Sequence, residues 1–137
     1  DVCWRALEAA VAMVPVAQIH VLHVMVPTDH ASPGVLVGNQ TDATRRAEVH
    51  TLLQTKLAEH GADGAHMHLA LGSSPPREIT AFAQEVGADL VLMTSHGRTG
   101  FKRWMLGSVA ETVVRRATCS VLVLRRRAHG VDPAADA

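Results

Sequence analysis

The regular alternation of short apolar runs with longer amphipathic stretches constrains the fold of this sequence more than any other feature. The apolar runs are rich in Val, Leu, Ile and Met and carry no charged residue apart from one Asp. The run at residues 18–26 has no alternation of apolar and polar positions, so we expect a strand that is buried on both faces, as in parallel sheets. The predicted strands are residues 18–26, 65–71, 89–93 and 120–124.

Amphipathic stretches connect the predicted strands. Apolar side chains recur in them at helical spacing, which predicts helices. Proline suits the first turn of a helix and glycine suits its end, so Pro75 and Pro76 mark one start, and Gly61 and Gly87 mark two ends. The predicted helices are residues 2–14, 42–60, the segment between Ser74 and Gly87, and residues 108–117. This order predicts an α/β fold with a single doubly wound, Rossmann-like, mostly parallel sheet and helices on both faces.

Length and composition narrow the class of protein. A chain of 137 residues fits one domain, which we place at residues 1–127, with residues 128–137 as a flexible tail. The 13 basic residues balance the 13 acidic ones and aromatic residues make up 3%, so we expect neither nucleic acid nor a membrane as partner. We find no apolar run long enough to span a bilayer, no signal peptide and no disulfide framework, which favours a cytoplasmic protein.

One loop has the composition of an anion-binding site. Residues 94–107 leave the carboxyl end of a predicted strand and lead into a predicted helix, which is where doubly wound sheets bind ligands. Gly97 and Gly100 lack a Cβ, so the backbone there can turn sharply and approach a ligand closely. Backbone N–H groups in such a turn can form an anion nest, and Arg98 can add a charge-assisted contact.

The helix after this loop begins with a capping pattern. Ser108 stands at the expected N-cap and Glu111 follows three residues later, which predicts a capping box. A phosphate could then bind between the N–H of Gly97 and the hydroxyl of Ser108, at the positive end of the helix dipole. The same residues also fit a turn and an ordinary capped helix that bind nothing. The loop contains neither a Walker A sequence nor G-x-G-x-x-G, so both interpretations stay open.

The segment SHGRTGFKRWMLGSVAETVVRRATCSVLVLR resembles the C-terminal half of universal stress proteins. The signature of that family, G-x2-G-x9-G-S/T, binds the ribose and phosphates of ATP in its nucleotide-binding members. Gly97, Gly107 and Ser108 match the signature, whereas Thr94 stands in place of its first glycine. The segments HVLHVMVP and GSSPPREITAFAQEVGADLVLMTSHG are also similar to the family, so the resemblance covers residues 5–127.

The resemblance implies a regulatory or sensor domain of the stress response that binds ATP or a related adenine nucleotide, with or without Mg²⁺. It also implies a homodimer that pairs through the strand at residues 120–124, and at most slow ATP hydrolysis, since no catalytic base is evident. Val24 is expected to line the adenine pocket. The expected nucleotide-binding residues are Val24, Thr94, Ser95, His96, Gly97, Arg98, Thr99, Gly100, Gly107, Ser108, Val109 and Ala110.

Two departures from the family keep other hypotheses open. Thr94 would crowd the ribose, and the family's first strand, whose Asp reaches the adenine, is absent from this sequence. We therefore expect the family's five-stranded sheet without its first strand, and we interpret Asp1 as a helix-start residue. The second hypothesis is a dimeric interaction module of the same fold that binds no nucleotide. A third is a nucleotide-handling enzyme of related architecture.

The other chemical candidates are more simply explained by packing. His20 and His23 lie in one predicted strand, and His66 and His68 share one face of another. Zinc needs three or four converging ligands, and no carboxylate or cysteine spacing supports such a set here. Cys119 precedes a buried strand and is expected to be a small core residue.

Overall fold

The computed structural model describes residues 4–27, 42–95 and 106–125. The helices are α1 (Trp4–Met13), α2 (Asp42–Glu59), α3 (Pro75–Glu85) and α4 (Ser108–Arg116), with a short 3-10 helix, η1 (Val16–Gln18), after α1. The strands are β1 (His20–Met25), β2 (His66–Leu71), β3 (Leu90–Thr94) and β4 (Ser120–Leu124). The predicted order of helices and strands is confirmed. The main difference is that β1 begins two residues later than expected, because η1 occupies the preceding segment.

The strands pair in parallel, as the sequence predicts. Strand β1 pairs with β2 in the register that places His20 opposite His66. Strand β3 pairs with β4, and Thr94 lies opposite Leu124 at the carboxyl end of both strands. The prediction of a single five-stranded sheet is not confirmed, because the described residues form two separate two-stranded sheets. A strand joins a sheet only through backbone hydrogen bonds to a neighbour, and within the described ranges none links the β1–β2 pair to the β3–β4 pair.

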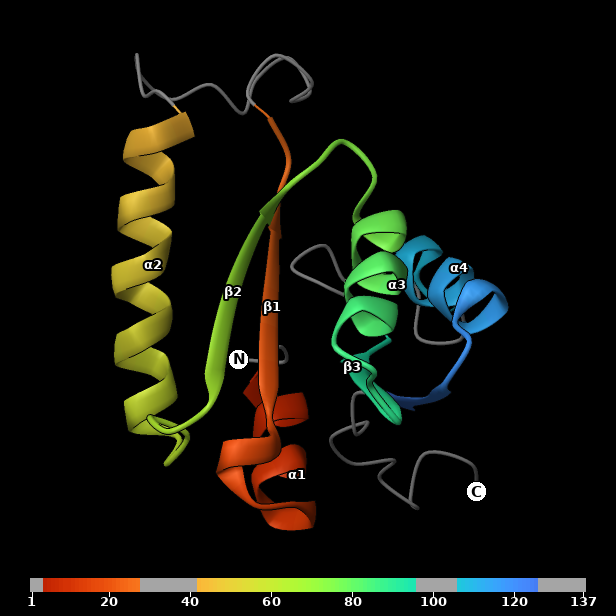
Figure 1. Cartoon of the computed structure of the whole chain (residues 1–137), viewed down its shortest axis with the longest axis horizontal. Helices are drawn as coiled ribbons and strands as arrows, with labels where there is room; N and C mark the ends of the chain where they lie inside the picture. The colour runs from red at the N-terminus through yellow and green to blue at the C-terminus, as the bar shows by residue number, and fades with distance from the viewer. Residues whose placement is uncertain (1–3, 28–41, 96–105, 126–137) are drawn as a thin grey trace, which may run out of the picture.

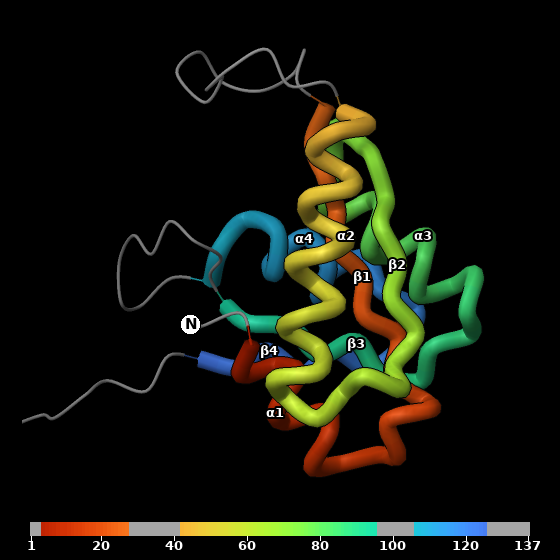
Figure 2. Tube along the Cα trace, turned by 90° about the vertical axis from the view of Figure 1, so that its left-hand side faces the viewer, coloured from red at the N-terminus to blue at the C-terminus, as the bar shows by residue number. Residues whose placement is uncertain are grey.

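Helices lie on both sides of the β1–β2 pair (Figure 1). Helix α2 runs along one side, where Leu57 belongs to a buried cluster against which Val21 and Met67 pack. Helix α3 covers the other side, where Phe82 contacts His68, and α3 also packs against α4. Figure 2 shows α2 on the side of the viewer, and Figure 1 shows α4 beyond α3 from this strand pair. The predicted placement of helices on both faces is therefore confirmed for this pair.

Two clusters of buried side chains anchor the helices. The first joins Leu7 of α1, Ile19 ahead of β1, and Leu57 and Ala62 at the end of α2. The second lies along α4, where Ala110 is 2% exposed and Val113 is fully buried. The spacing of three between these two positions places them on one face of the helix. Burial of that face fixes the rotation of α4 and thereby the direction of its first turn.

Glycines end two of the helices, as predicted. Gly61 and Gly87 have φ values of 68° and 62°, in the left-handed region that glycine adopts without steric cost. After α2, Ala62 N–H donates to the carbonyl of Leu57 across 2.7 Å and Gly61 N–H to that of Ala58 across 3.1 Å. This pair of bonds is the Schellman motif, which satisfies the last carbonyls of a helix.

Candidate functional site

The two ends of the predicted anion-binding loop are tied together by their backbones. Ser95 directly follows β3, and Gly107 directly precedes α4. The N–H of Gly107 donates a hydrogen bond to the carbonyl of Ser95 across 2.9 Å, and Ser95 N–H donates to the carbonyl of Leu124 across 2.9 Å. Ser95 is only 6% exposed, so these bonds lie in a poorly hydrated environment. We call the bond between Gly107 and Ser95 the loop clamp, because it fixes the start of α4 beside the carboxyl end of β3.

The start of α4 differs from the predicted capping box. Gly107 is the N-cap, with φ −62° and ψ 150°, and Ser108 is the first helical residue. The N–H of Glu111 donates to the carbonyl of Gly107 across 2.9 Å, which moves the helix start one residue ahead of the expected position. Glu111 consequently cannot act as the third residue of a capping box. Its carboxylate pairs instead with Arg115, one turn later, at 2.9 Å.

The corrected start gives α4 an N-cap residue that cannot cap the helix with a side chain. Gly107 has no side chain, so the N-cap residue makes no side-chain hydrogen bond to the first turn. The first N–H groups of a helix lack partners within it, and they carry the positive end of its dipole. Ser108 is exposed, whereas Ala110 is buried against the core. The helix start therefore offers backbone donors and one accessible hydroxyl, an arrangement suited to an anion.

The structure brings together six of the twelve predicted site residues. Two of these residues lie at the end of β3, and the other four lie at the start of α4. The loop clamp holds these two groups next to each other. These residues are Thr94, Ser95, Gly107, Ser108, Val109 and Ala110. Val24 lies on β1, opposite Ala70, in the other strand pair, so its predicted contact with the same ligand is not tested. The predicted residues His96, Gly97, Arg98, Thr99 and Gly100 lie outside the described ranges.

Sequence reasoning missed the structural role of the Ser95 and Leu124 backbones. Both contribute carbonyl groups, and a carbonyl is present at every position, so their side chains carry no signal of this role. The glycine N-cap had no such signal either, because serine is the more favoured N-cap residue and stands directly after Gly107.

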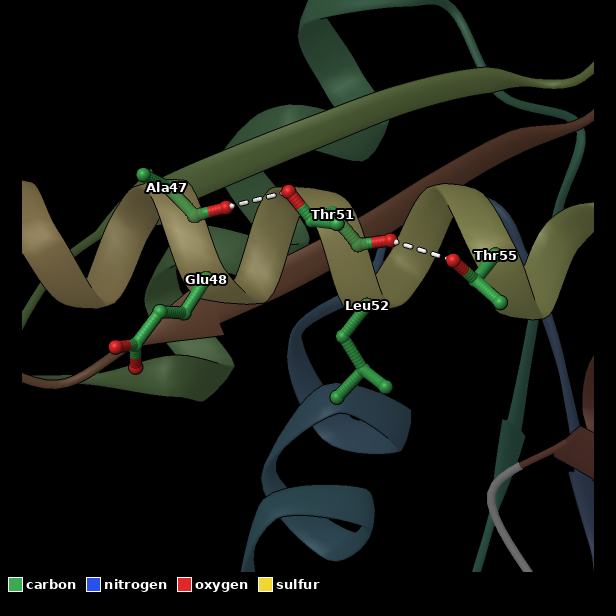
Figure 3. A pocket seen from close by; sticks show the side chains of 5 residues that line it. All are labelled: Ala47, Glu48, Thr51, Leu52 and Thr55. Atoms are coloured by element: carbon green, nitrogen blue, oxygen red, sulfur yellow. Dashed lines mark hydrogen bonds between the residues drawn. The ribbon is translucent and has the colours of Figure 1, made fainter.

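A shallow groove lies elsewhere, along the surface of α2 (Figure 3). It has a volume of about 590 Å³ and is lined by Ala47, Glu48, Thr51, Leu52 and Thr55. The hydroxyls of Thr51 and Thr55 donate to carbonyls one turn earlier, at 3.1 Å each, so they offer no donor to a ligand. The lining is mostly apolar and its one charge is negative, which makes the groove a poor site for phosphate.

Two kinds of feature are absent from the part of the chain that the structure describes. No group of three or more His, Cys, Asp or Glu side chains there could hold a metal ion. None of the described helices is both long and apolar enough to cross a membrane.

Comparison with known proteins places the chain in a family. The model of the universal stress protein family matches residues 1–125. The chain belongs to this family. Universal stress protein MJ0531 of Methanocaldococcus jannaschii is 42% identical over 71 residues, which are 52% of this chain. The aligned segment spans only 41% of the length of that relative.

Solved structures show the same fold. Protein MJ0577 is similar to this universal stress protein chain with a TM-score of 0.71 and 26% identity, over 91% of this chain and 88% of the other. A universal stress protein from Archaeoglobus fulgidus in complex with dAMP is similar with a TM-score of 0.52 and 25% identity, over 86% of this chain and 79% of the other. The α/β fold with parallel strands is thus shared with members of the family.

Proposed function

We propose that this universal stress protein domain binds ATP or a related adenine nucleotide and acts as a regulatory or sensor module in the stress response. The observation that carries the proposal is the loop clamp. It holds the start of α4, whose N-cap is a glycine, beside the carboxyl end of β3, across 2.9 Å from Gly107 to Ser95. Backbone N–H groups held in this way can bind a phosphate without reorganising when the ligand arrives.

A structural neighbour supports the choice of nucleotide. The Archaeoglobus fulgidus protein of this family was solved with dAMP, which carries an adenine and one phosphate. In the proposal, the phosphates lie over the first turn of α4, with the hydroxyl of Ser108 as a further donor. Residues 97–100 approach the ribose and phosphates, and Val24 lines the adenine. Mg²⁺ accompanies the nucleotide through its phosphate oxygens.

We assign binding rather than catalysis to this site. The described residues at the start of α4 offer donors, and the nearest carboxylate in the helix, Glu111, pairs with Arg115 at 2.9 Å. Hydrolysis of ATP needs a group that activates or orients water. The proposal therefore expects at most slow turnover of bound ATP.

The homodimer implied by the family belongs to the same proposal, through β4. Leu122, in the middle of this strand, is 39% exposed, and β4 pairs only with β3 among the described strands. A second copy would satisfy the free edge of β4. Light scattering tests this: a Val123→Pro variant, which lacks one strand N–H, should be monomeric at concentrations where the wild type is dimeric.

A second candidate function is a protein-interaction module that binds no nucleotide. Thr94 favours it, since this β-branched side chain stands half-buried at the carboxyl end of β3, where the family signature has glycine. A side chain at that point would crowd the ribose. If the Thr94 side chain prevents the ribose from binding, Thr94→Gly should raise the affinity for ATP.

Isothermal titration with ATP separates the two functions. We expect wild-type protein to bind and Gly97→Ala to bind more weakly, because a Cβ blocks close approach of the ligand to the backbone. Gly64→Ala is the matched control, because Gly64 lies between α2 and β2, outside the proposed site, and its new Cβ would make an ordinary contact of 3.5 Å with Val16. Absence of wild-type binding at millimolar ATP would contradict the leading proposal and favour the interaction module.

A further inference from the structure

Three imidazoles form a cluster at the amino ends of β1 and β2, outside the proposed nucleotide site. His20 of β1 stacks on His66 of β2, with ring centroids 4.7 Å apart and an interplanar angle of 25°. His20 also contacts His68, two residues further along β2, with centroids 5.3 Å apart and an angle of 17°. The register that pairs His20 with His66 places all three rings on one face of this sheet.

A hydrogen bond joins two of these rings. Nδ1 of His20 lies 3.1 Å from Nε2 of His68, so one nitrogen donates and the other accepts. A neutral imidazole has one donor and one acceptor, whereas a protonated imidazole has two donors. The bond is therefore compatible with no charge or with one charge on the pair. Two charges would leave two N–H groups facing each other.

The third ring limits the charge further. His66 Nε2 lies 3.1 Å from the carbonyl of Ala17, to which it donates, so the position of this ring is fixed over His20. A proton on His66 therefore adds positive charge beside His20. Partial desolvation and the charges of His66 and His68 lower the pKa of His20 below its ordinary value. The cluster thus resists full protonation.

The cluster connects the sheet to α3. The ring of Phe82, from α3, lies 4.5 Å from that of His68 and 6.2 Å from that of His20. The charged side chains of α3 are Arg77, Glu78 and Glu85, and none of them forms an ion pair or hydrogen bond with the cluster within the described ranges. Positive charge gained by the imidazoles is therefore not neutralised from the helix.

We propose that His20, His66 and His68 form a pH-sensitive clasp, which holds α3 on the β1–β2 pair near neutral pH and loosens this contact as the solution is acidified. The first proton is accommodated by the His20–His68 hydrogen bond, in which a protonated ring can donate to a neutral one. A second proton places like charges on neighbouring rings. If it binds to the His20–His68 pair, both rings become donors and the hydrogen bond between them loses its acceptor. His20 and His66 are exposed, so protons reach them without prior unfolding.

The sign of the effect follows from linkage. A base with a lower pKa in the folded protein binds fewer protons there than in the unfolded chain. Its contribution to stability is complete above the ordinary histidine value of about 6.5 and is lost as the pH falls through the folded pKa of His20. Acidification from pH 7.5 to pH 5 should therefore lower the urea concentration at the midpoint of unfolding.

Matched variants test the clasp. In His20→Gln the amide can still bond to His68 but cannot titrate, so the midpoint should fall less with acidification than in the wild type. His50→Gln removes an exposed histidine on α2 and should behave as the wild type does. Parallel pH dependence of wild type and His20→Gln would overturn the proposal, as would a reduced dependence in His50→Gln.

A second measurement uses wild-type protein alone, so that it does not depend on the folding of a variant. Proton–carbon NMR should show one of the three imidazoles titrating below the ordinary range, with the Phe82 resonances moving at the same pH. Hydrogen exchange of the α3 amides, corrected for the intrinsic effect of pH, should accelerate on acidification relative to those of α2. Three independent titrations at the ordinary value, without change in Phe82 or in α3 exchange, would overturn the clasp.

Discussion

The N–H of Gly107 donates a hydrogen bond to the carbonyl of Ser95 across 2.9 Å, which joins the segments on either side of residues 96–106. Because Ser95 N–H also donates to Leu124, this junction is fixed to β4 as well. The end of β3, the start of α4 and the end of β4 thus meet at one point. The proposed phosphate site depends on this junction more than on any single side chain.

Gly107→Pro should weaken this junction without altering the local backbone. The φ of Gly107 is −62°, which proline adopts, but proline lacks the N–H that Ser95 accepts. We expect the free energy of unfolding to fall by about 1 kcal/mol, the typical net value of a hydrogen bond. Denaturant titration measures this loss. ATP affinity should fall in parallel if the proposed function is correct.

Gly107→Ala is the control for this variant. Alanine tolerates the same negative φ and keeps the N–H donor. An equally large loss of stability in Gly107→Ala and Gly107→Pro would show that a steric clash of the added Cβ, and not loss of the hydrogen bond, destabilises the protein.

Ser108→Ala should separate stability from binding. Ser108 is the first helical residue and not the N-cap, so loss of its hydroxyl should change the free energy of unfolding by less than about 0.5 kcal/mol. If the hydroxyl donates to a phosphate, ATP affinity should fall about tenfold, since hydrogen bonds to charged groups contribute about 1.5 kcal/mol or more. Calorimetry and denaturant titration give the two values. A stability loss near 1 kcal/mol would instead support the capping role that the sequence suggested.

Val113→Ala and Val114→Ala test how α4 is oriented. Val113 is fully buried, whereas its neighbour Val114 is 47% exposed. We expect a loss of about 2 kcal/mol at position 113, from two buried methyl groups and the cavity left behind. At position 114 the change should stay within about 0.5 kcal/mol. Similar losses at both positions would mean that α4 is rotated differently on the core.

Gly61→Ala should destabilise the end of α2 through backbone strain alone. No atom of the residues that the structure describes comes within 4 Å of the Cβ that alanine would add, but φ is +68°, where an L-residue costs about 1 kcal/mol. Thermal or urea unfolding should show that loss. Gly64→Ala, three residues later, lacks a positive φ and should be close to neutral. Equal effects of the two substitutions would exclude strain as the cause.

Much of the fold follows from residue patterns that act locally. Apolar runs such as residues 120–124 specify parallel strands, and Gly61 and Gly87 specify helix ends because they adopt positive φ without steric cost. Burial of both faces does not follow from such a run, because Leu122 of this strand is 39% exposed. The position of the loop between β3 and α4 followed from the apolar run before it and the helical spacing of apolar residues after it. These features depend on near neighbours in the chain, so they can be inferred from the sequence.

Other features depend on parts of the chain that are distant in sequence. The capping box predicted at Ser108 was wrong because the N-cap is Gly107, which a backbone bond to Ser95 fixes from the other end of the loop. The separation of the strands into two pairs also escaped the sequence, since any apolar run can pair with any other.

The sequence by itself determined the alternation of elements, the helix ends and the resemblance to universal stress proteins, because these reside in local propensities and in side-chain identity. Only the tertiary structure decided that Ser95 and Gly107 meet, and that His20, His66, His68 and Phe82 form one cluster. Such contacts arise from backbone groups that every residue shares and from strand register. The register is fixed only when the sheet and its helices pack together.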